Sequence, residues 1–293
     1  MTELDTPTGT LLRLAAFTTD PAGGNPAGVW LGDALPDPTE MQRIATAVGY
    51  SETAFLAPDG SGDPGRFRVR YFSPAKEVAF CGHATIASGV ALAEGGWPAS
   101  LVLRTNDGVV DLDVVGDADG RFQATLTSVE PWVRELPDGL LDRLLGLLGW
   151  RRDELDPALP PGLAFAGVRH PIIAVKELST LAQIDYDFEP MRTLMLEHDL
   201  TTLQLIWRET ATRFRARDPF AAGGVVEDPA TGAAAAALGA YLRERGEVTA
   251  PATFEISQGV EMGRPSLLTV SIVADDPRIR VSGTAVPIPL TPG

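Results

Sequence analysis

Two stretches of this chain follow the same pattern, and their first glycines lie 150 residues apart. In GHATIASGVALAE, residues 82–94, and in GAAAAALGAYLRERG, residues 232–246, a Gly begins a run of small and apolar residues. Such runs have a high helix propensity, and Arg243, Arg245 and Gly246 fit the end of a helix. A pattern that returns after a fixed distance predicts a duplicated domain with one such helix in each half.

Strand-like segments follow each predicted helix in the same order. Within residues 101–127 they are LVLRT, VVDLDVV and FQATLT, and within residues 253–288 they are TFEISQG, LLTVSIV and RIRVSGTAVPI. Turns are predicted at Asn106-Asp107-Gly108 and Asp119-Gly120, because Asp-Gly pairs adopt the positive φ of tight hairpins. The two halves therefore predict an α/β chain of two domains, with a boundary within residues 128–137.

Other segments predict the framework around these repeats. RFRVRYF, Arg66–Phe72, alternates as a half-buried strand does, and VAF, Val78–Phe80, is predicted as a short buried strand. DGLLDRLLGLLGW, Asp138–Trp150, predicts a helix capped by Asp138 whose leucines pack into a core. In the second half, alternating arginines predict a solvated or paired strand face: Arg213, Arg215 and Arg217.

The composition argues against several classes of partner. A formal net charge of −15 repels nucleic-acid phosphates, so no nucleic-acid partner is expected. The longest apolar helical run, residues 232–242, is too short to cross a membrane, and the start, MTELDTPTG, lacks a secretory signal. We expect no membrane partner and a cytoplasmic location.

Metal and nucleotide motifs are also missing from the sequence. The chain has one Cys and three His, at positions 83, 170 and 198, without a paired-His motif, so no dedicated metal site is expected. GSGDPG, residues 60–65, matches a dinucleotide pattern but precedes a strand and contains Pro, which predicts a surface turn. No Walker sequence is present. The sequence therefore predicts no cofactor.

The start of the first predicted helix is the leading candidate site. About four N–H groups at a helix start lack acceptors and carry partial positive charge, so a carboxylate can dock on Gly82, Ala84 and Thr85. Cys81 precedes this helix, and His83 lies in its first turn beside such a ligand. A buried thiol and a core imidazole are the structural alternatives for these two side chains.

Glu52 is a candidate for acid–base chemistry. Together with Ser51, it lies between a predicted helix, Met41–Tyr50, and the short apolar strand AFL. This setting removes water from a carboxylate, as a proton shuttle requires, although a Glu with satisfied hydrogen bonds at a strand entrance is the alternative. Asn25 lies in a Gly-rich loop that can bring backbone close to a ligand.

The second helix start offers a corresponding candidate. Asp228 before Pro229 fits a helix entry, and an N-cap role alone would explain it. Thr231, Gly232 and Ala233 then provide a second set of helix-start N–H groups. Two halves that face each other would bring both helix starts to one cleft.

Four motifs, in this order, carry a family resemblance: GNPAGV, SETAFL, RYFSPAKEVAFCGHAT and EDPATGAA. They resemble the PhzF-like phenazine-biosynthesis family over nearly the whole chain. That family has the diaminopimelate epimerase-like fold, in which two pseudo-symmetric α/β domains each wrap a twisted sheet or open barrel around a central helix. The resemblance implies domains of residues 1–128 plus about 281–293, and 129–280. It also implies that a closing strand, Val281 to Leu290, completes the first domain.

The resemblance also implies an activity and its residues. The family's proton-transferring glutamate falls on Glu52, its histidine on His83 and its cleft aspartate on Asp228. The implied function is that of a cofactor-independent isomerase, and the implied assembly is a homodimer. The family's best-characterised member isomerises a dihydro-hydroxyanthranilate. The implied small-molecule substrate bears a carboxylate, and the residues expected to bind it are Asn25, Ser51, Cys81, Gly82, Ala84, Thr85, Thr231, Gly232 and Ala233.

Two departures from the family pattern leave alternatives open. Ala233 replaces the usual Ser, which removes one hydroxyl from the second helix start. A single cysteine excludes a two-thiol racemase, but Cys81 with Asp228 or Glu52 would make an epimerase. A lyase shares the first deprotonation step, and a binding or scaffold protein could keep the fold without turnover.

Overall fold

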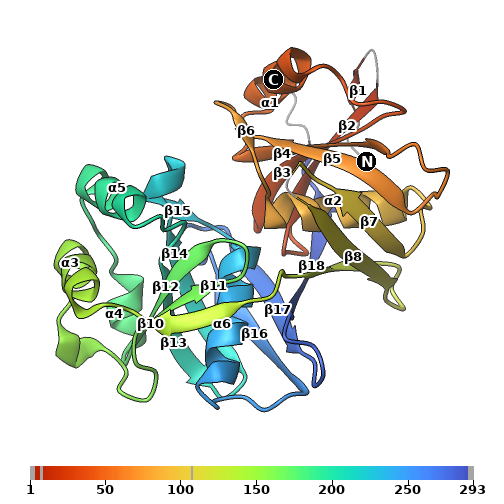
Figure 1. The fold of residues 1–293 in the computed structure, drawn as a ribbon. Helices are drawn as coiled ribbons and strands as arrows, with labels where there is room; N and C mark the ends of the chain where they lie inside the picture. Colours follow the sequence, from red (N-terminus) through yellow and green to blue (C-terminus); the bar gives the residue numbers. More distant parts are fainter. Residues whose placement is uncertain (1–3, 7–8, 107, 290–293) are drawn as a thin grey trace. The chain divides into compact units, whose positions relative to one another are not determined.

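The computed structural model describes residues 4–6, 9–106 and 108–289 (Figure 1). The predicted turn residue Asp107 and the far end of the predicted closing strand, Leu290, lie outside the described residues. By its internal contacts the chain divides into unit 1, Met1–Thr127 with Ser282–Gly293, and unit 2, Ser128–Val281. Each unit is described by itself.

Unit 1 is built on a closed barrel of eight strands. Its ring runs β2–β3–β4–β5–β7–β8–β9–β18 and returns to β2, with parallel pairs at β3–β4 and β5–β7. Strands β1 and β6 pair with β2 and β5. The elements are β1 Leu4–Thr6, β2 Gly9–Ala16, β3 Asn25–Leu31, α1 Pro38–Val48, β4 Glu52–Pro58, β5 Arg66–Phe72, β6 Glu77–Val78, α2 Gly82–Glu94, β7 Ser100–Arg104, β8 Val109–Gly116, β9 Phe122–Thr127 and β18 Ile279–Pro287.

Helix α2 is enclosed by this barrel (Figure 1). Every residue from His83 to Leu92 is buried. A helix enclosed on all sides needs small or apolar residues around its whole circumference, and most residues of this segment are of that kind. Gly89 shows how close the packing is, because a Cβ there would lie 2.8 Å from Leu112 and 3.0 Å from Ala124. The small residues by which the sequence predicted α2 are therefore needed for the helix to fit inside the barrel.

Unit 2 wraps a second sheet around a second helix. The strand order is β10–β11–β12–β13–β14–β16–β17, with parallel pairs at β12–β13 and β14–β16, and β15 adds to β14. Helix α6 packs on β10 to β13 and β17. The elements are β10 Trp132–Glu135, α3 Asp138–Leu148, β11 Gly162–Phe165, β12 Arg169–Val175, α4 Leu178–Ala182, α5 Phe188–Glu197, β13 Gln204–Thr210, β14 Arg213–Pro219, β15 Glu227–Asp228, α6 Gly232–Glu244, β16 Ala252–Gln258 and β17 Ser266–Ile272, with 3-10 turns at Arg152–Glu154 and Ala221–Gly223.

The two units repeat one succession of elements, which confirms the predicted fold class. β5–β6–α2–β7–β8–β9 corresponds to β14–β15–α6–β16–β17–β18, where β18 begins in unit 2 and continues from Ser282 into unit 1, and both central helices have 13 residues. The predicted strand at residues 66–72 and the predicted meanders of both halves are confirmed. The closing strand is confirmed within the described residues, because β18 pairs with β2.

Three local predictions were wrong. The buried strand predicted at Val78–Phe80 is limited to Glu77–Val78, and Phe80 is exposed with its ring edge-on to Tyr71. Asp228 is not the helix N-cap, because α6 begins at Gly232 and Thr231 occupies the cap position. Asp138 does not cap α3 but is its first helical residue.

Among the described residues, no helix combines the length and the apolar character that a membrane crossing requires. The arginines of β14 are all paired, as predicted, with partners on neighbouring segments: Arg213 with Glu255, Arg215 with Glu261 and Arg217 with Glu227.

The leucine stripe of α3 is core, as the sequence predicts, and this gives a test of packing. Leu144 is fully buried among the leucines and methionines of α3 and α5, whereas Leu147 of the same helix is only partly buried. We expect Leu144→Ala to lower the free energy of unfolding by about 2–5 kcal/mol, because it leaves a cavity, and Leu147→Ala to lower it by less. Urea denaturation of both variants measures the difference. Equal losses would contradict this account of the core.

Candidate functional site

The start of α2 is polar although the helix is buried. Its N-cap residue is Cys81, whose side chain does not cap the helix. Intrahelical bonding begins with the Thr85 N–H, which donates to the Cys81 carbonyl at 3.0 Å. By helix geometry the N–H groups of Gly82, His83 and Ala84 therefore have no acceptor within the helix. This end of the barrel presents donors and partial positive charge.

The hydroxyl of Thr85 faces the interior of unit 1 instead. It donates to the Cys81 carbonyl at 2.7 Å, so the Tyr71 hydroxyl, also at 2.7 Å, is the donor to Thr85. Burial raises the pKa of Tyr71 above its usual range, which keeps this hydroxyl protonated. The Thr85 side chain thus fastens the helix start to β5, and only its backbone belongs to the helix mouth.

The end of α1 places Glu52 beside this mouth. The helix stops at Gly49, whose φ of 73° is readily adopted by glycine, and the chain turns through Ser51 into β4. Glu52 begins β4 and pairs in parallel with Ala27 of β3, while Asn25 begins β3. Three separate strand and helix beginnings therefore bring Asn25, Glu52 and His83 to the same end of the barrel.

Side chains of this group contact one another directly. Glu52 Oε2 lies 3.5 Å from His83 Nε2 and 3.5 Å from Cys81 Sγ. Cys81 Sγ lies 3.4 Å from His83 Nδ1, and Ser51 Oγ lies 3.4 Å from His83 Nε2. His83 and Cys81 are buried, whereas the Glu52 side chain keeps 15% of its surface exposed. Solvent or a ligand therefore reaches the Glu52 carboxylate more easily than the side chains of His83 and Cys81.

Asn25 determines which nitrogen of His83 carries the proton. Its side-chain nitrogen lies 3.1 Å from His83 Nδ1, and an amide nitrogen only donates. Nδ1 therefore accepts, and in the neutral ring the proton resides on Nε2. That N–H is directed to the side where Glu52 and Ser51 lie, so it can donate to a carboxylate or to a developing negative charge.

The same cluster contains three kinds of metal ligand. One ligand atom each from Glu52, Cys81 and His83 lies within 4.8 Å of the others. The sequence gave no sign of this, because the residues come from two separate segments without a metal-binding spacing. The prediction that the protein uses no metal is not tested by this proximity.

Unit 2 has a different set of polar contacts at its helix start. Thr231 Oγ1 donates to Asp228 Oδ2 at 2.6 Å, and Gln258 Nε2 donates to the Asp228 carbonyl at 2.8 Å. Gln258 also accepts from the Thr231 N–H at 3.2 Å. Gly232 and Ala233 follow as the first helical residues, and Ala233 is partly exposed. The structure therefore joins the predicted residues Asp228, Thr231, Gly232 and Ala233 within unit 2.

Behind Asp228 lies a buried polar group that the sequence did not predict. Thr202 Oγ1 donates to Asp218 Oδ1 at 2.8 Å and lies 2.9 Å from His170 Nδ1. Because the hydroxyl proton goes to Asp218, His170 Nδ1 is the donor to Thr202. Burial lowers the pKa of His170 to about 4 and raises the pKa of Asp218 well above its usual range, with the Asp228 and Glu227 carboxyls adding to the second effect. The only sign of this polar group in the sequence was Asp218 itself, an acidic residue within a strand whose adjacent residues are buried.

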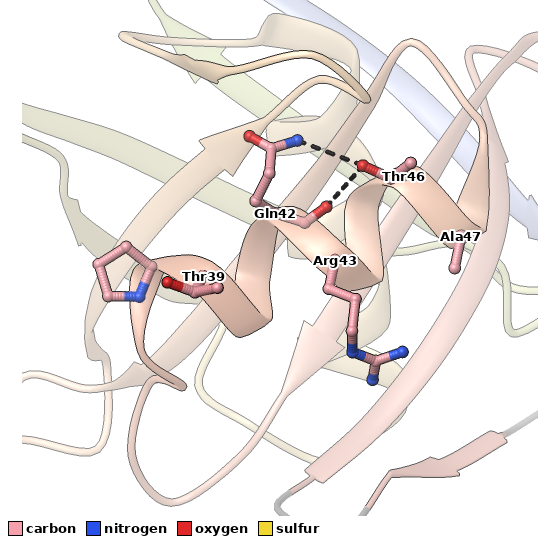
Figure 2. A pocket seen from close by; sticks show the side chains of 6 residues that line it. Thr39, Gln42, Arg43, Thr46 and Ala47 are labelled. Atoms are coloured by element: carbon pink, nitrogen blue, oxygen red, sulfur yellow. Dashed lines mark hydrogen bonds between the residues drawn. The ribbon is translucent and has the colours of Figure 1, made fainter.

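A surface hollow of about 700 Å³ lies elsewhere in unit 1, along α1 (Figure 2). Its lining comprises Pro38, Thr39, Gln42, Arg43, Thr46 and Ala47, and it includes none of the predicted site residues. Gln42 donates to the Ser73 carbonyl at 2.9 Å, and Thr46 donates to the Pro74 carbonyl at 2.9 Å. These contacts hold α1 to the loop between β5 and β6, so the hollow has a structural explanation.

Comparison with known proteins decides the family. The model of the PhzC-PhzF family, described as phenazine biosynthesis-like protein, matches residues 14–289. The chain belongs to the PhzC-PhzF family. It is 31% identical to a trans-2,3-dihydro-3-hydroxyanthranilate isomerase from Pseudomonas fluorescens, over 92% of this chain and 94% of that protein. It is 34% identical to an uncharacterized isomerase from Deinococcus radiodurans, over 91% of this chain and 88% of that one.

A solved structure agrees with this kinship. A PhzF-family phenazine biosynthesis protein from Bacillus anthracis is similar with a TM-score of 0.85 and 28% identity, over 97% of this chain and 98% of that one. The predicted family is confirmed, and this PhzC-PhzF member is an isomerase. Which of its residues act in the reaction remains a prediction.

The buried histidine of this PhzC-PhzF protein makes its stability sensitive to acid. The folded-state pKa of His170 is about 4, below the 6.5 of an unperturbed histidine, so protons bind preferentially to the unfolded chain as the pH falls through this window. Wild type should lose up to about 3 kcal/mol of stability from this source between about pH 6.5 and pH 4. His170→Asn keeps a donor for Thr202 but does not titrate, so its urea-denaturation curves should show a smaller acid loss. Parallel pH dependences of the two proteins would contradict the assignment.

Proposed function

We propose that this protein is a cofactor-independent isomerase that moves a proton on a small carboxylate-bearing substrate, with Glu52 as the group that carries the proton. The observation behind the proposal is the contact of Glu52 with His83 and Cys81 at the open N-terminus of α2, at 3.5 Å in both cases. An acceptor for a proton and donors for an anion thus occur side by side within unit 1.

The chemistry follows from these neighbours. Backbone N–H groups of Gly82, His83 and Ala84 bind the substrate carboxylate at the helix start. Glu52 removes a proton from one carbon and returns it to another, while the His83 Nε2–H stabilises the charge that develops between the two steps. These donors act at short range, where they overcome the repulsion of an acidic substrate by a chain of net charge −15.

We extend the proposal to Asp228 in unit 2. Its carboxylate accepts a hydrogen bond from Thr231 Oγ1, which fixes its orientation, and a hydroxyl or amino group of the substrate would donate to this carboxylate. The N–H groups of Gly232 and Ala233 at the start of α6 are a further place for an anionic group. Ala233 contributes no hydroxyl there, so we propose that the substrate makes fewer polar contacts than one held by a Ser at that position.

The substrate class is proposed by kinship. A relative that is 31% identical is named for trans-2,3-dihydro-3-hydroxyanthranilate, a cyclic carboxylate that also carries amino and hydroxyl groups. This compound is therefore the first to test, followed by cyclic and acyclic amino and hydroxy acids.

Other expectations stay predictions from the sequence. We propose a cytoplasmic homodimer with neither a nucleic-acid nor a membrane partner and without a cofactor. Sedimentation of the purified protein tests the dimer, and activity that survives dialysis against a chelator tests independence from metal. A monomer alone, or loss of activity that added metal restores, would contradict the corresponding expectation.

Replacement of Glu52 tests the central role. Glu52→Gln keeps the shape of the side chain but removes the proton acceptor, so we expect isomerisation to fall by roughly 10²–10⁴-fold. The measurement follows the substrate panel by NMR in D₂O and records deuterium that appears at carbon. Glu40→Gln, which removes an exposed carboxylate paired with Arg43 on α1, is the control and should exchange as wild type does.

Two results would contradict the proposal. Equal deuterium incorporation by Glu52→Gln and wild type would assign the proton to another group. Tight binding of a panel member by wild type without any exchange would favour a binding protein that keeps the isomerase fold.

Cys81 separates an isomerase from an epimerase on the same scaffold. The thiol lies 3.5 Å from Glu52, so a second proton-transfer group is physically available. If Glu52 alone carries the proton, Cys81→Ala should slow exchange much less than Glu52→Gln, and the product should be a positional isomer. A loss equal to that of Glu52→Gln, with inversion of a stereocentre by wild type, would instead indicate a two-base epimerase. Product NMR and chiral chromatography distinguish the two outcomes.

A further inference from the structure

Unit 2 contains a carboxyl that the proposed reaction does not use. Asp218 lies in β14 directly opposite Asp228 of β15, in an antiparallel pair whose next members are Pro219 and Glu227. Residues directly opposite each other on paired strands project from the same face of the sheet. The two aspartates are therefore cross-strand neighbours, one of them fully buried and the other close to the helix start.

No positive charge compensates Asp218 among the groups described around it. Arg217, the preceding residue of β14, is engaged by Glu227 through two hydrogen bonds at 3.0 and 2.5 Å. From β12, His170 reaches Asp218 only through the Thr202 hydroxyl, and burial keeps this ring neutral. The charged groups that remain near Asp218 are the carboxyls of Asp228 and Glu227, both on β15.

Neutral dipoles complete the surroundings of Asp218. Thr202 Oγ1 donates to Asp218 Oδ1 at 2.8 Å. The atom of the Gln204 side-chain amide that faces Asp218 lies 2.9 Å from Oδ1 and 3.1 Å from Oδ2. An ionised Asp218 would be repelled by the Asp228 carboxylate on the facing strand, and burial adds the cost of removing the charge of Asp218 from water. The proton therefore belongs to the more buried carboxyl.

The other unit has a comparable group at the same register position. Tyr71 lies opposite Val78 in the β5–β6 pair, as Asp218 lies opposite Asp228 in the β14–β15 pair. Tyr71 is fully buried and holds its proton, which it donates to Thr85. The common framework thus places a buried, oxygen-bearing side chain next to the start of each central helix.

We propose that Asp218 holds a proton beside the carboxylate of Asp228, so that the pair carries a single negative charge and Asp218 acts as a positioning residue for Asp228. The consequence for the reaction rests on the proposed function. With Asp218 neutral, Asp228 remains an anion that can orient a donor group of the substrate. Loss of the Asp218 proton would add a second negative charge to the pair and impair that role.

A stability measurement tests the proton without any substrate. A carboxyl whose folded-state pKa is raised stabilises the fold fully below the unfolded value, near 4, and this stabilisation is lost as the pH rises toward the folded-state pKa. Asp218→Asn is permanently neutral. Its unfolding equilibrium constant relative to wild type should therefore fall about tenfold for each pH unit above about pH 4, until Asp218 of the folded wild type ionises. A ratio that does not change with pH would overturn the proposal.

An infrared measurement on wild type covers the case that Asp218→Asn does not fold. The C=O stretching band of a protonated carboxyl is distinct from the bands of carboxylates. We expect this band to persist at neutral pH, and its absence would overturn the proposal.

The pH profile of deuterium exchange tests the positioning role. Wild type should lose activity on the alkaline side as Asp218 ionises, whereas Asp218→Asn should lack this limb, whatever its rate at neutral pH. Tyr71→Phe is the matched control, because it removes a hydroxyl at the equivalent position of unit 1 and should keep the wild-type shape. An unchanged alkaline limb in Asp218→Asn would overturn the role. The stabilities of wild type and Asp218→Asn could diverge with pH although wild type exchanges no deuterium. In that case the proposed function fails, while the assignment of a proton to Asp218 stands.

Discussion

The start of a buried helix that its N-cap side chain does not cap is the constraint on which this site depends. Helix α2 runs inside a closed barrel, where its small residues fit, and its first N–H groups receive no cap from Cys81. A buried donor without an acceptor is costly, so this end must meet solvent, a ligand or polar side chains. Glu52, His83, Ser51 and Asn25 lie there because the strands and loops that carry them begin or end at the same rim. The fold thus places backbone donors where we propose that the substrate carboxylate binds.

The framework was largely readable from the sequence because its signals are local. Runs of small residues predicted α2 and α6, and strand-like segments predicted both meanders, with Asp-Gly turns between them in the first half. Errors occurred where tertiary contacts overrode local preference. Phe80 is exposed because only two residues of that segment pair with β5, and Asp228 belongs to a strand because β14 pairs with it. Strand β10 falls within residues 128–137, which the sequence had predicted only as a boundary between the halves.

The candidate site could be predicted from the sequence only in part. The motifs identified Glu52, His83, Cys81 and Asp228, but not how near the first three lie to one another within unit 1, since the pairing of distant strands sets those distances. Asp218, Thr202 and His170 were missed because they come from three segments and each looks ordinary by itself. The duplicated framework also obscured a difference in chemistry. Unit 1 surrounds its helix start with a carboxylate, a thiol and an imidazole, whereas unit 2 has carboxyls, a threonine and a glutamine.

The most direct test of the account follows a labelled hydrogen through the reaction. A substrate that the protein accepts would carry deuterium at the donor carbon, and its turnover in H₂O would be followed by NMR at the acceptor carbon. If Glu52 carries the proton from one carbon to the other, wild type transfers part of the label within the molecule and Glu52→Gln transfers none. Transfer of label by Glu52→Gln at the wild-type level would contradict the account, because another group would then carry the proton.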